Sequence, residues 1–431
     1  MPDVLGLADR LWNGDASISE HHPVLHDHGV VEICDGVAFV ASLANVSAFS
    51  TESGLVLVDT GSSPFARNIH NELRRWTDRP LHTAVYSHGH IDHVFGVPVW
   101  EEEARVNRWP APQVVAHEAV GRRFDRYVLT AGYNAVVNRR QFGFENLEWP
   151  TDYRYPDRTY HDHLDLEVGG RALELRHERG ETDDHTITWV PDRKVLCCGD
   201  LFIWASPNAG NPQKVQRYPL EWAQALRRMV ALEPEFLLPG HGLPIVGRDR
   251  VRQALSDTAA LLESLVAQTL ELMNAGARLD DALHTVRSPS DLAGRPYLQP
   301  VYDEPEFIVH NVWRLYGGWW DGNPATLLPA PERALASELA ELAGGPAALA
   351  GRALTLMEEA AGDESADPPG LRLAGHLAEL AWLASPDDPV TIEVRRAVYG
   401  ARAERASSTM ARGVFRWASK HPAPDRAGGA G

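Results

Sequence analysis

In the first half of the chain, short apolar runs alternate with longer stretches in which apolar residues repeat at helical spacing. The short runs predict strands at residues 30–42, 53–61, 83–88, 112–117, 171–178, 185–191, 194–200 and 235–242. The longer stretches predict helices at residues 62–77, 117–142 and 220–234. Strands interleaved with helices in this way indicate a layered α/β architecture.

The pattern changes after residue 247, where the strand signal stops. Apolar residues then recur at helical spacing, which predicts helices at residues 251–276, 331–345, 346–362, 371–385 and 390–419. We therefore expect an α/β domain at residues 1–247, an all-α domain at residues 248–420, and a disordered tail at residues 421–431.

Charge and cysteine content narrow the function classes. Across 431 residues, 41 Lys and Arg stand against 59 Asp and Glu, which gives a formal net charge of −18. Such an excess repels phosphate backbones, so no nucleic-acid partner is expected, and an anionic substrate would need positive charge gathered locally. Three cysteines cannot form a disulfide framework, and we expect neither a secretory leader nor a membrane-spanning segment from this sequence. The expectation is a cytoplasmic protein without a membrane partner.

The strongest chemical signal is the segment SHGHIDHVFG, which places His88, His90, Asp92 and His93 within six residues. Imidazole is the commonest metal ligand, and carboxylate suits a divalent cation. The apolar run TAVY precedes the segment, so the cluster should lie on a loop at the end of a strand, where α/β layers form their sites. His88 and His90 can face one metal, while Asp92 and His93 face another.

Further candidate ligands follow later strands. Asp200 comes directly after the strand VLCCG, and His241 follows the run LLPG. A third element, RGETDDHT, lies upstream of Asp200 and contains Glu181 and His185. Asp59, in VLVDTG, also follows a strand, and we expect it to orient a ligand histidine or a turn rather than to bind metal. Recurrence at several strand ends favours a metal centre over a surface loop with chance histidines.

These elements resemble the metallo-β-lactamase superfamily, which carries the motif HxHxDH, a downstream ligand element, a strand ending in Gly-Asp, and a Gly-His near the end of the domain. The resemblance covers about residues 30–245 and implies an αββα sandwich with a dinuclear metal site between the sheets. Asp92 and Asp200 are expected to be catalytic as well as metal-binding. The implied ligands are His88, His90 and Glu181 for the first metal, Asp92, His93 and His241 for the second, and Asp200 as a bridge.

The superfamily usually has histidine at the position of Glu181. His185 is the alternative ligand, but the separation from the Gly-Asp element favours Glu181. Glutamate here is typical of the alkylsulfatase branch, which the segments YNAVVNRRQFG and RLYGGWWDGNPATLLP also resemble. The resemblance implies that the helical part is an alkylsulfatase dimerisation domain and that the protein is a homodimer. Asp200 departs from that branch, which usually has glutamate there, and this departure bears on the substrate more than on the fold.

The function that this resemblance implies is hydrolysis of a sulfate ester of an alkyl alcohol by a metal-activated water. Two divalent ions are expected, and zinc is the first choice of metal. A glutamate ligand lets manganese or iron compete better with zinc for the site. The alternative is hydrolysis of a thioester, lactone or other carboxylic ester at the same site. A non-catalytic dimerisation module with a relic metal site is a third interpretation, against which the complete ligand set argues. Candidate contacts to an anionic small-molecule ester are Tyr133, Asn134, Arg139, Arg140, Lys214 and Arg217.

Overall fold

The structure, a computed structural model, describes residues 3–24 and 29–421. Beyond His421, the predicted tail lies outside the described residues. The chain divides into two compact units. The first unit comprises residues 1–131 and 149–319, and the second comprises residues 132–148 and 320–431.

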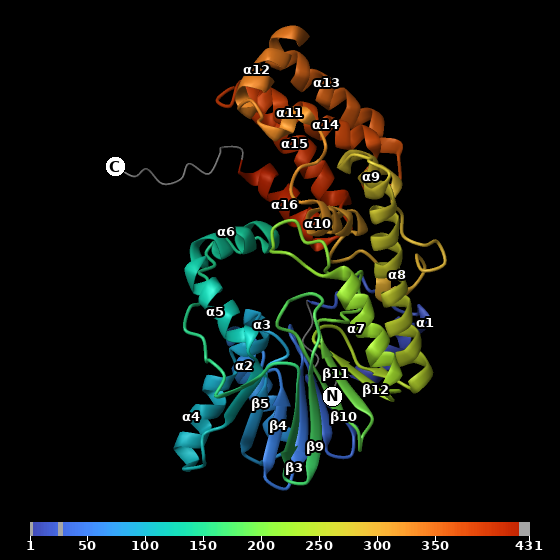
Figure 1. The fold of residues 1–431 in the computed structure, drawn as a ribbon. Coiled ribbons are helices and arrows are strands. Elements are labelled where there is room, and N and C mark those ends of the chain that lie inside the picture. The colour runs from blue at the N-terminus through green and yellow to red at the C-terminus, as the bar shows by residue number, and fades with distance from the viewer. Residues whose placement is uncertain (1–2, 25–28, 422–431) are drawn as a thin grey trace. The chain divides into compact units, whose positions relative to one another are not determined.

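Two sheets form the centre of the first unit (Figure 1). The seven-stranded sheet follows chain order: β1 (Gly29–Cys34), β2 (Val37–Ala41), β3 (Val46–Thr51), β4 (Gly54–Val58), β5 (Leu81–Val85), β6 (Gln113–His117) and β7 (Arg158–Tyr160). Pairing is antiparallel from β1 to β4 and parallel from β4 to β7. Parallel strands bring their carboxyl ends to one edge of the sheet, where the loops after β4 and β5 meet.

The second sheet has six strands in the order β13-β12-β11-β10-β9-β8. Their bounds are β8 (His163–Val168), β9 (Arg171–His177), β10 (Thr186–Val190), β11 (Val195–Gly199), β12 (Phe236–Pro239) and β13 (Ile245–Val246). β11 and β12 pair in parallel, and the neighbouring pairs in this sheet are antiparallel.

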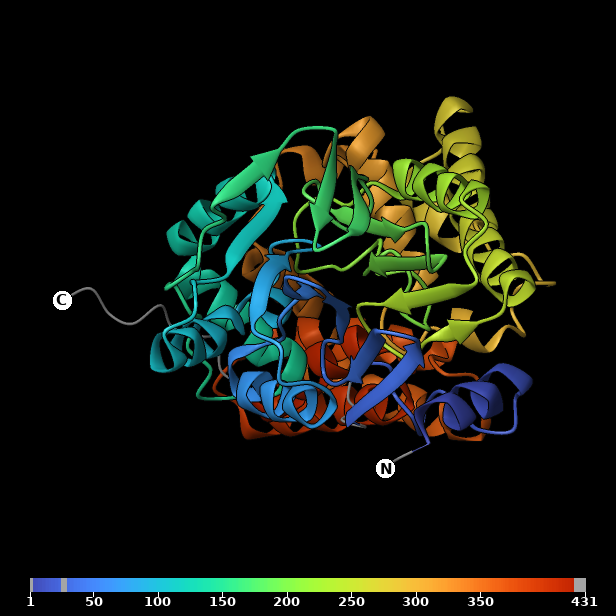
Figure 2. The same ribbon diagram turned by 90° about the horizontal axis from the view of Figure 1, so that it is seen from below.

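Helices cover the outer faces of both sheets. Helix α2 packs against β1 and β2, α4 packs against β5, and α8 packs against β12, β13 and α7. Figure 2 shows the strands between the mid-blue and cyan helices α2, α4 and α5 on one side and the yellow-green helices α7 and α8 on the other. The helices of this unit are α1 (Val4–Asn13), α2 (Ser63–Trp76), α3 (Ile91–Val94), α4 (Val97–Asn107), α5 (Ala119–Leu129), α7 (Pro219–Ala231), α8 (Arg248–Asn274), α9 (Leu279–Thr285) and α10 (Pro305–Gly317), with a 3-10 turn at Pro296–Leu298.

The first unit has two separate hydrophobic cores, because side chains along each strand alternate between the two faces of the sheet. Strand β2 is buried along its whole length, and its side chains point to opposite faces in turn. Phe39 joins the core between the sheets with Leu175 of β9, whereas Val40 joins the outer core with Ile69 of α2 and Trp100 of α4. Burying each such side chain contributes about 1.5–3 kcal/mol. The predicted αββα sandwich is therefore confirmed.

The second unit is helical and has its own core. Small residues dominate its centre, among them Ala350, Ala353, Ala374 and Ala378, and small side chains let helix axes approach closely. Gly413 of α16 lies so close to the backbone of Gln141 in α6 that a Cβ would come within 2.0 Å of its carbonyl oxygen. The helices are α6 (Ala131–Phe142), α11 (Pro324–Leu327), α12 (Glu332–Ala343), α13 (Pro346–Glu359), α14 (Pro369–Ala384), α15 (Pro389–Arg405) and α16 (Thr409–Lys420), with a 3-10 turn at Ala360–Gly362.

The packing units do not coincide with the predicted domains. Residues 248–319 pack within the first unit, and residues 132–148 pack within the second. Packing alone does not define what folds or functions separately, so the boundary between residues 247 and 248 stays a prediction. Among the described residues, no helix has the length and apolar character needed to cross a bilayer.

Candidate metal centre

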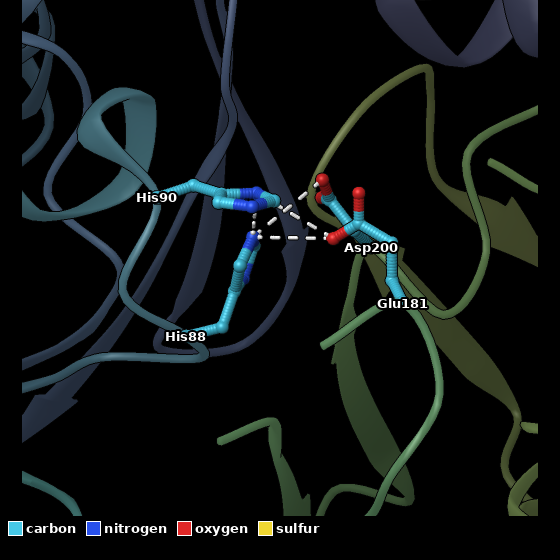
Figure 3. A group of neighbouring side chains, drawn as sticks. All are labelled: His88, His90, Glu181 and Asp200. Atoms are coloured by element: carbon cyan, nitrogen blue, oxygen red, sulfur yellow. Dashed lines mark hydrogen bonds and ion pairs between the residues drawn. The ribbon is translucent and has the colours of Figure 1, made fainter. Parts of the chain in front are cut away.

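Two histidines and a glutamate converge at the end of β5 and β9. His88 and His90 lie on the loop between β5 and the short helix α3, and Glu181 lies on the loop after β9. Nε2 of His88 is 2.7 Å from Nδ1 of His90, and Oε2 of Glu181 is 3.5 Å from each of these nitrogens (Figure 3). With Asp200 these residues form a group whose ligand atoms all lie within 4.8 Å of one another.

A second group lies beside the first. It contains Asp92 and His93 from α3 together with His241 from the loop after β12, again with ligand atoms within 4.8 Å of one another. Asp200, directly after β11, faces both groups. Its Oδ2 is 3.8 Å from Nε2 of His88 and 3.3 Å from Nε2 of His241, and its Oδ1 is 3.5 Å from Nε2 of His93. Every predicted ligand thus lies in one of the two groups.

The donor atoms fit a cation. Among the described residues, three buried atoms at the centre have no hydrogen-bond partner: Nε2 of His93, Oε2 of Glu181 and Oδ1 of Asp200. Buried polar atoms are normally paired, and a buried carboxylate is costly without a positive partner. Imidazole nitrogens and carboxylate oxygens in this mixture are the ligands of zinc and similar divalent ions. The arrangement therefore suggests a site for divalent metal.

Burial and charge set the protonation of the ligands. Burial holds the pKa values of His88 and His90 well below their usual range, so both imidazoles are neutral and can donate a lone pair. Burial opposes ionisation of Asp200, but the His241 and His93 rings beside it hold its pKa well below the usual value. Burial also lowers the pKa of His241, but Asp200 outweighs that effect and raises it to about 10. A metal ion would compete with protons at this imidazole.

Hydrogen bonds behind the ligands orient the imidazoles. Asp59, in the left-handed region with φ 61°, accepts a 2.8 Å bond from Nδ1 of His93. It also accepts a 2.7 Å bond from the Ser87 hydroxyl, which lies 2.9 Å from Nδ1 of His88. Nδ1 of His241 donates to the Leu43 carbonyl at 2.6 Å. In each case Nε2 is left to face the centre, as in metal sites whose ligands are fixed from behind. The expectation that Asp59 orients a histidine is confirmed.

A buried ion pair that the sequence did not reveal supports the histidine loop. Asp184 accepts hydrogen bonds from the Gly89 amide at 3.0 Å and from Nε of Arg123 at 2.7 Å. A Cβ at Gly89 would meet Cδ of Arg123 at 2.8 Å, so this position has no room for a side chain. Because Gly89 lies between His88 and His90, the pair fixes the loop that carries both.

Glu181 and His185 have different surroundings. Oε1 of Glu181 accepts a 2.7 Å hydrogen bond from Nδ2 of Asn208 and lies 2.6 Å from Nη1 of Arg217, which leaves Oε2 toward His88 and His90. His185 instead donates from Nε2 to the Cys198 carbonyl at 3.0 Å and lies in neither group of candidate ligands. This geometry favours Glu181 as the ligand.

The predicted substrate contacts fall in both units. Lys214 and Arg217 lie in the first unit with the metal centre. Tyr133, Asn134, Arg139 and Arg140 lie in the second unit, where Tyr133 is exposed and Nε of Arg139 donates to the Leu147 carbonyl at 2.8 Å. Their contact with substrate stays a prediction.

Tyr302 was missed by the sequence analysis. Burial, together with the carboxylates of Asp92 and Glu181, holds its pKa well above the usual value, so the hydroxyl stays protonated near the centre. Its ring meets that of His22 edge to face at 6.3 Å. No local sequence signal marks this residue, because it lies between helices far along the chain from the ligands.

Comparison with known proteins agrees with this geometry. Residues 40–241 match the metallo-beta-lactamase superfamily, and residues 278–422 match the alkyl sulfatase dimerisation family. The chain is thus similar to the metallo-β-lactamase superfamily over residues 40–241 and to the alkyl sulfatase dimerisation family over residues 278–422.

Individual relatives point to the same branch. The chain is 29% identical over 318 residues to a linear primary-alkylsulfatase of Pseudomonas sp., covering 68% of this chain and 59% of that protein. It is 25% identical over 362 residues to an alkyl/aryl-sulfatase of Saccharomyces cerevisiae, covering 76% of this chain and 54% of that protein. Its fold matches that of a stereoselective inverting sec-alkylsulfatase from Pseudomonas sp. with a TM-score of 0.80 and 22% identity. The match covers 92% of this chain and 66% of that one. The chain thus spans less than two thirds of the length of each.

Proposed function

We propose that the protein is a dinuclear metal-dependent hydrolase that cleaves a sulfate ester of an alkyl alcohol. The observation that carries the proposal is the position of Asp200, whose Oδ2 lies 3.8 Å from Nε2 of His88 in the first ligand group and 3.3 Å from Nε2 of His241 in the second. A carboxylate placed in this way can bridge two cations. The alkylsulfatase relatives supply the substrate class.

In this proposal His88, His90 and Glu181 hold one ion, Asp92, His93 and His241 hold the other, and Asp200 is shared. Bound divalent ions lower the pKa of water and stabilise negative charge on a leaving oxygen. Asp92 and Asp200 are the catalytic carboxylates, since both lie within about 4 Å of ligand imidazoles and can accept a proton or orient water. Zinc is the first choice because histidine and carboxylate ligands suit it.

Positive charge near the centre fits an anionic ester. The side chain of Arg217 is 3% exposed, and its Nε has no hydrogen-bond partner among the described residues. Burial lowers the pKa of Lys214 to about 8, an effect that Arg217 strengthens, so the ammonium is mostly charged at neutral pH. Lys214 and Arg217 are the proposed contacts to a sulfate group from the first unit, and Tyr133, Asn134, Arg139 and Arg140 remain proposed contacts from the second unit.

The remaining assignments belong to the same proposal. Residues 1–247 would form the catalytic domain and residues 248–420 the dimerisation domain of a homodimer, in line with the match at residues 278–422. None of the described cysteines forms a disulfide, which suits the reducing cytoplasm as the location.

The test is a paired assay on protein loaded with zinc or manganese. We expect sulfate release from medium-chain alkyl sulfates, and about two divalent ions per chain by elemental analysis. His90→Ala and Asp200→Asn should each lose at least one ion and nearly all turnover. Hydrolysis of carboxylic esters or thioesters with no sulfate release would favour the alternative substrate class. Full activity in metal-stripped protein with chelator present would refute the mechanism.

A further inference from the structure

The carboxylate of Glu181 is held from the side away from the histidines. Its Oε1 accepts a hydrogen bond from Nδ2 of Asn208 at 2.7 Å and forms an ion pair with Nη1 of Arg217 at 2.6 Å. Nη1 of Arg217 also donates to the backbone carbonyl of Glu181 at 2.6 Å. Both donors are buried, so Oε1 is fully engaged and Oε2 is directed to His88 and His90. The direction of the proposed ligand atom thus depends on two side chains from the loop after β11.

Asn311, in α10, fixes the position of Arg217. Its Oδ1 accepts from the Arg217 amide at 3.4 Å, and its Nδ2 donates to the Arg217 carbonyl at 3.0 Å. Oδ1 also accepts from Nε2 of Gln216 at 3.0 Å and from Nη2 of Arg314 at 3.1 Å. The buried side-chain amide of Asn311 therefore pairs with both the N–H and the C=O of Arg217, as the backbone of a neighbouring strand would.

Asp303 fixes the segment that carries Asn208. Its Oδ2 accepts from the amides of Gly210 at 2.7 Å and Asn211 at 3.2 Å. A Cβ at Gly210 would meet the backbone of Phe307 at 2.3 Å, so the segment lies directly against the start of α10. The two donors on Glu181 are thus anchored independently by Asp303 and Asn311.

We propose that Asp303 and Asn311 are positioning residues of the metal centre, which fix Asn208 and Arg217 and through them the orientation of Glu181. The inference rests on the proposed metal-binding role of Glu181. Residues behind a metal ligand typically change metal affinity about 10–100-fold when they are removed. Part of the sequence after residue 247 would then serve the metal centre rather than dimerisation.

The test compares Asn311→Leu with Gln268→Leu. Gln268 also pairs with both sides of a backbone, accepting from the Arg287 amide at 3.1 Å and donating to its carbonyl at 2.9 Å, but it touches no candidate ligand. Each variant is loaded with zinc, and the dissociation constant is measured by chelator competition beside the melting temperature. We expect about a 10–100-fold loss of zinc affinity for Asn311→Leu at one of the two ions. Gln268→Leu should lose melting temperature and keep its zinc affinity.

Equal zinc affinity in the two variants would overturn the inference and leave Asn311 a purely structural residue. Should Asn311→Leu fail to fold, Asn208→Ala replaces it, because this change removes one donor to Oε1 without touching Arg217. Unchanged zinc affinity in Asn208→Ala would equally overturn the inference. Wild-type protein that binds zinc tightly but releases no sulfate would refute the proposed function alone, whereas wild-type protein that binds no zinc would refute both.

Discussion

Asp59 meets His93 at 2.8 Å on the side of the ring that faces away from the candidate metals, and the same carboxylate reaches His88 through the Ser87 hydroxyl. One aspartate therefore sets the tautomer of one histidine in each ligand group. Its left-handed backbone, uncommon for a residue other than glycine, keeps the carboxylate beneath the loop.

Asp59→Asn should weaken both ligand groups at once. Asparagine tolerates the left-handed conformation, so the backbone is preserved while the anionic acceptor is lost. We expect metal affinity to fall about 10–100-fold, measured by chelator competition. Asp157→Asn is the control, since that carboxylate accepts the Val114 amide at 2.8 Å and touches no candidate ligand. Unaltered metal affinity in Asp59→Asn would show that the histidines need no anion behind them.

Metal content separates Glu181 from His185 as the ligand. Glu181→Gln keeps the size of the side chain but removes the charged oxygen donor, so metal affinity and turnover should both fall. His185→Ala should keep both ions, because His185 is committed to the Cys198 carbonyl. Glu181→His restores a donor and adds one unit of charge, and it should bind metal with an altered preference among esters. If the glutamine variant keeps two tightly held ions while His185→Ala loses one, the ligand assignment is wrong.

Asp303 should give the stability of the metal-free protein a distinctive pH dependence. Burial raises the pKa of this carboxyl to about 7, against the hydrogen bonds from the loop amides and the charge of Arg217. An acid whose pKa is raised on folding stabilises the fold at low pH, and this contribution is lost as pH rises toward 7. Asp303→Asn lacks this stabilising contribution. Its free energy of unfolding, measured with urea from pH 5 to 8, should therefore vary less with pH than that of the wild type. At about 1.4 kcal/mol per pKa unit, the roughly two pH units between 5 and 7 should shift the free energies of unfolding of variant and wild type relative to one another by up to about 3 kcal/mol. If the free energies of unfolding of the two proteins change with pH in parallel, Asp303 is ionised throughout the range from pH 5 to 8.

An apolar stripe on α12 is the expected contact between protomers. Leu335, Leu339 and Leu342 are 54%, 36% and 76% exposed and follow one another at helical spacing. Light scattering should give about twice 47.6 kDa for the wild type, because exposed apolar patches mark association sites. Leu335→Ser with Leu342→Ser should shift the protein toward monomer, whereas Val106→Ser, an exposed apolar position on α4, should not. A wild type that is monomeric at micromolar concentration would contradict the homodimer.

The sequence predicted well which candidate ligands lie close together, because they stand at strand ends and are residue types with few other uses there. It could not reveal the residues that hold them. Asp184 and Arg123 are 61 positions apart, and Arg217 and Asn311 are 94 apart, so each pair depends on how distant loops meet. Strand β3, VSAFST, was also missed, because its serines and threonine are typical of turns. Ser47 and Thr51 are buried there only because the strand lies between β2 and β4.

The helices predicted at residues 62–77, 220–234 and 251–276 are confirmed as α2, α7 and α8, but those predicted at residues 117–142 and 390–419 are each two helices, and α1, α4 and α10 were missed. The packing of the helices was not evident from the pattern either. Helix α6 follows α5 almost without a break, yet it packs in the second unit, while α8, α9 and α10 pack in the first. Amphipathic spacing shows that a helix has an apolar face and does not say which surface covers that face.

The order of the ligands along the chain matters for how the protein is synthesised. Roughly 150 residues separate His88 from His241, and α10 follows later still. At the usual 5–20 residues per second, the ribosome needs about 8–30 s to cover that interval. During this time the nascent chain displays the histidine loop without its last ligand and without Asn311. The complete set of proposed ligands therefore exists only once His241 has been synthesised, and the support from Asn311 follows later, so stable metal loading is expected after these residues have emerged rather than at the histidine loop alone.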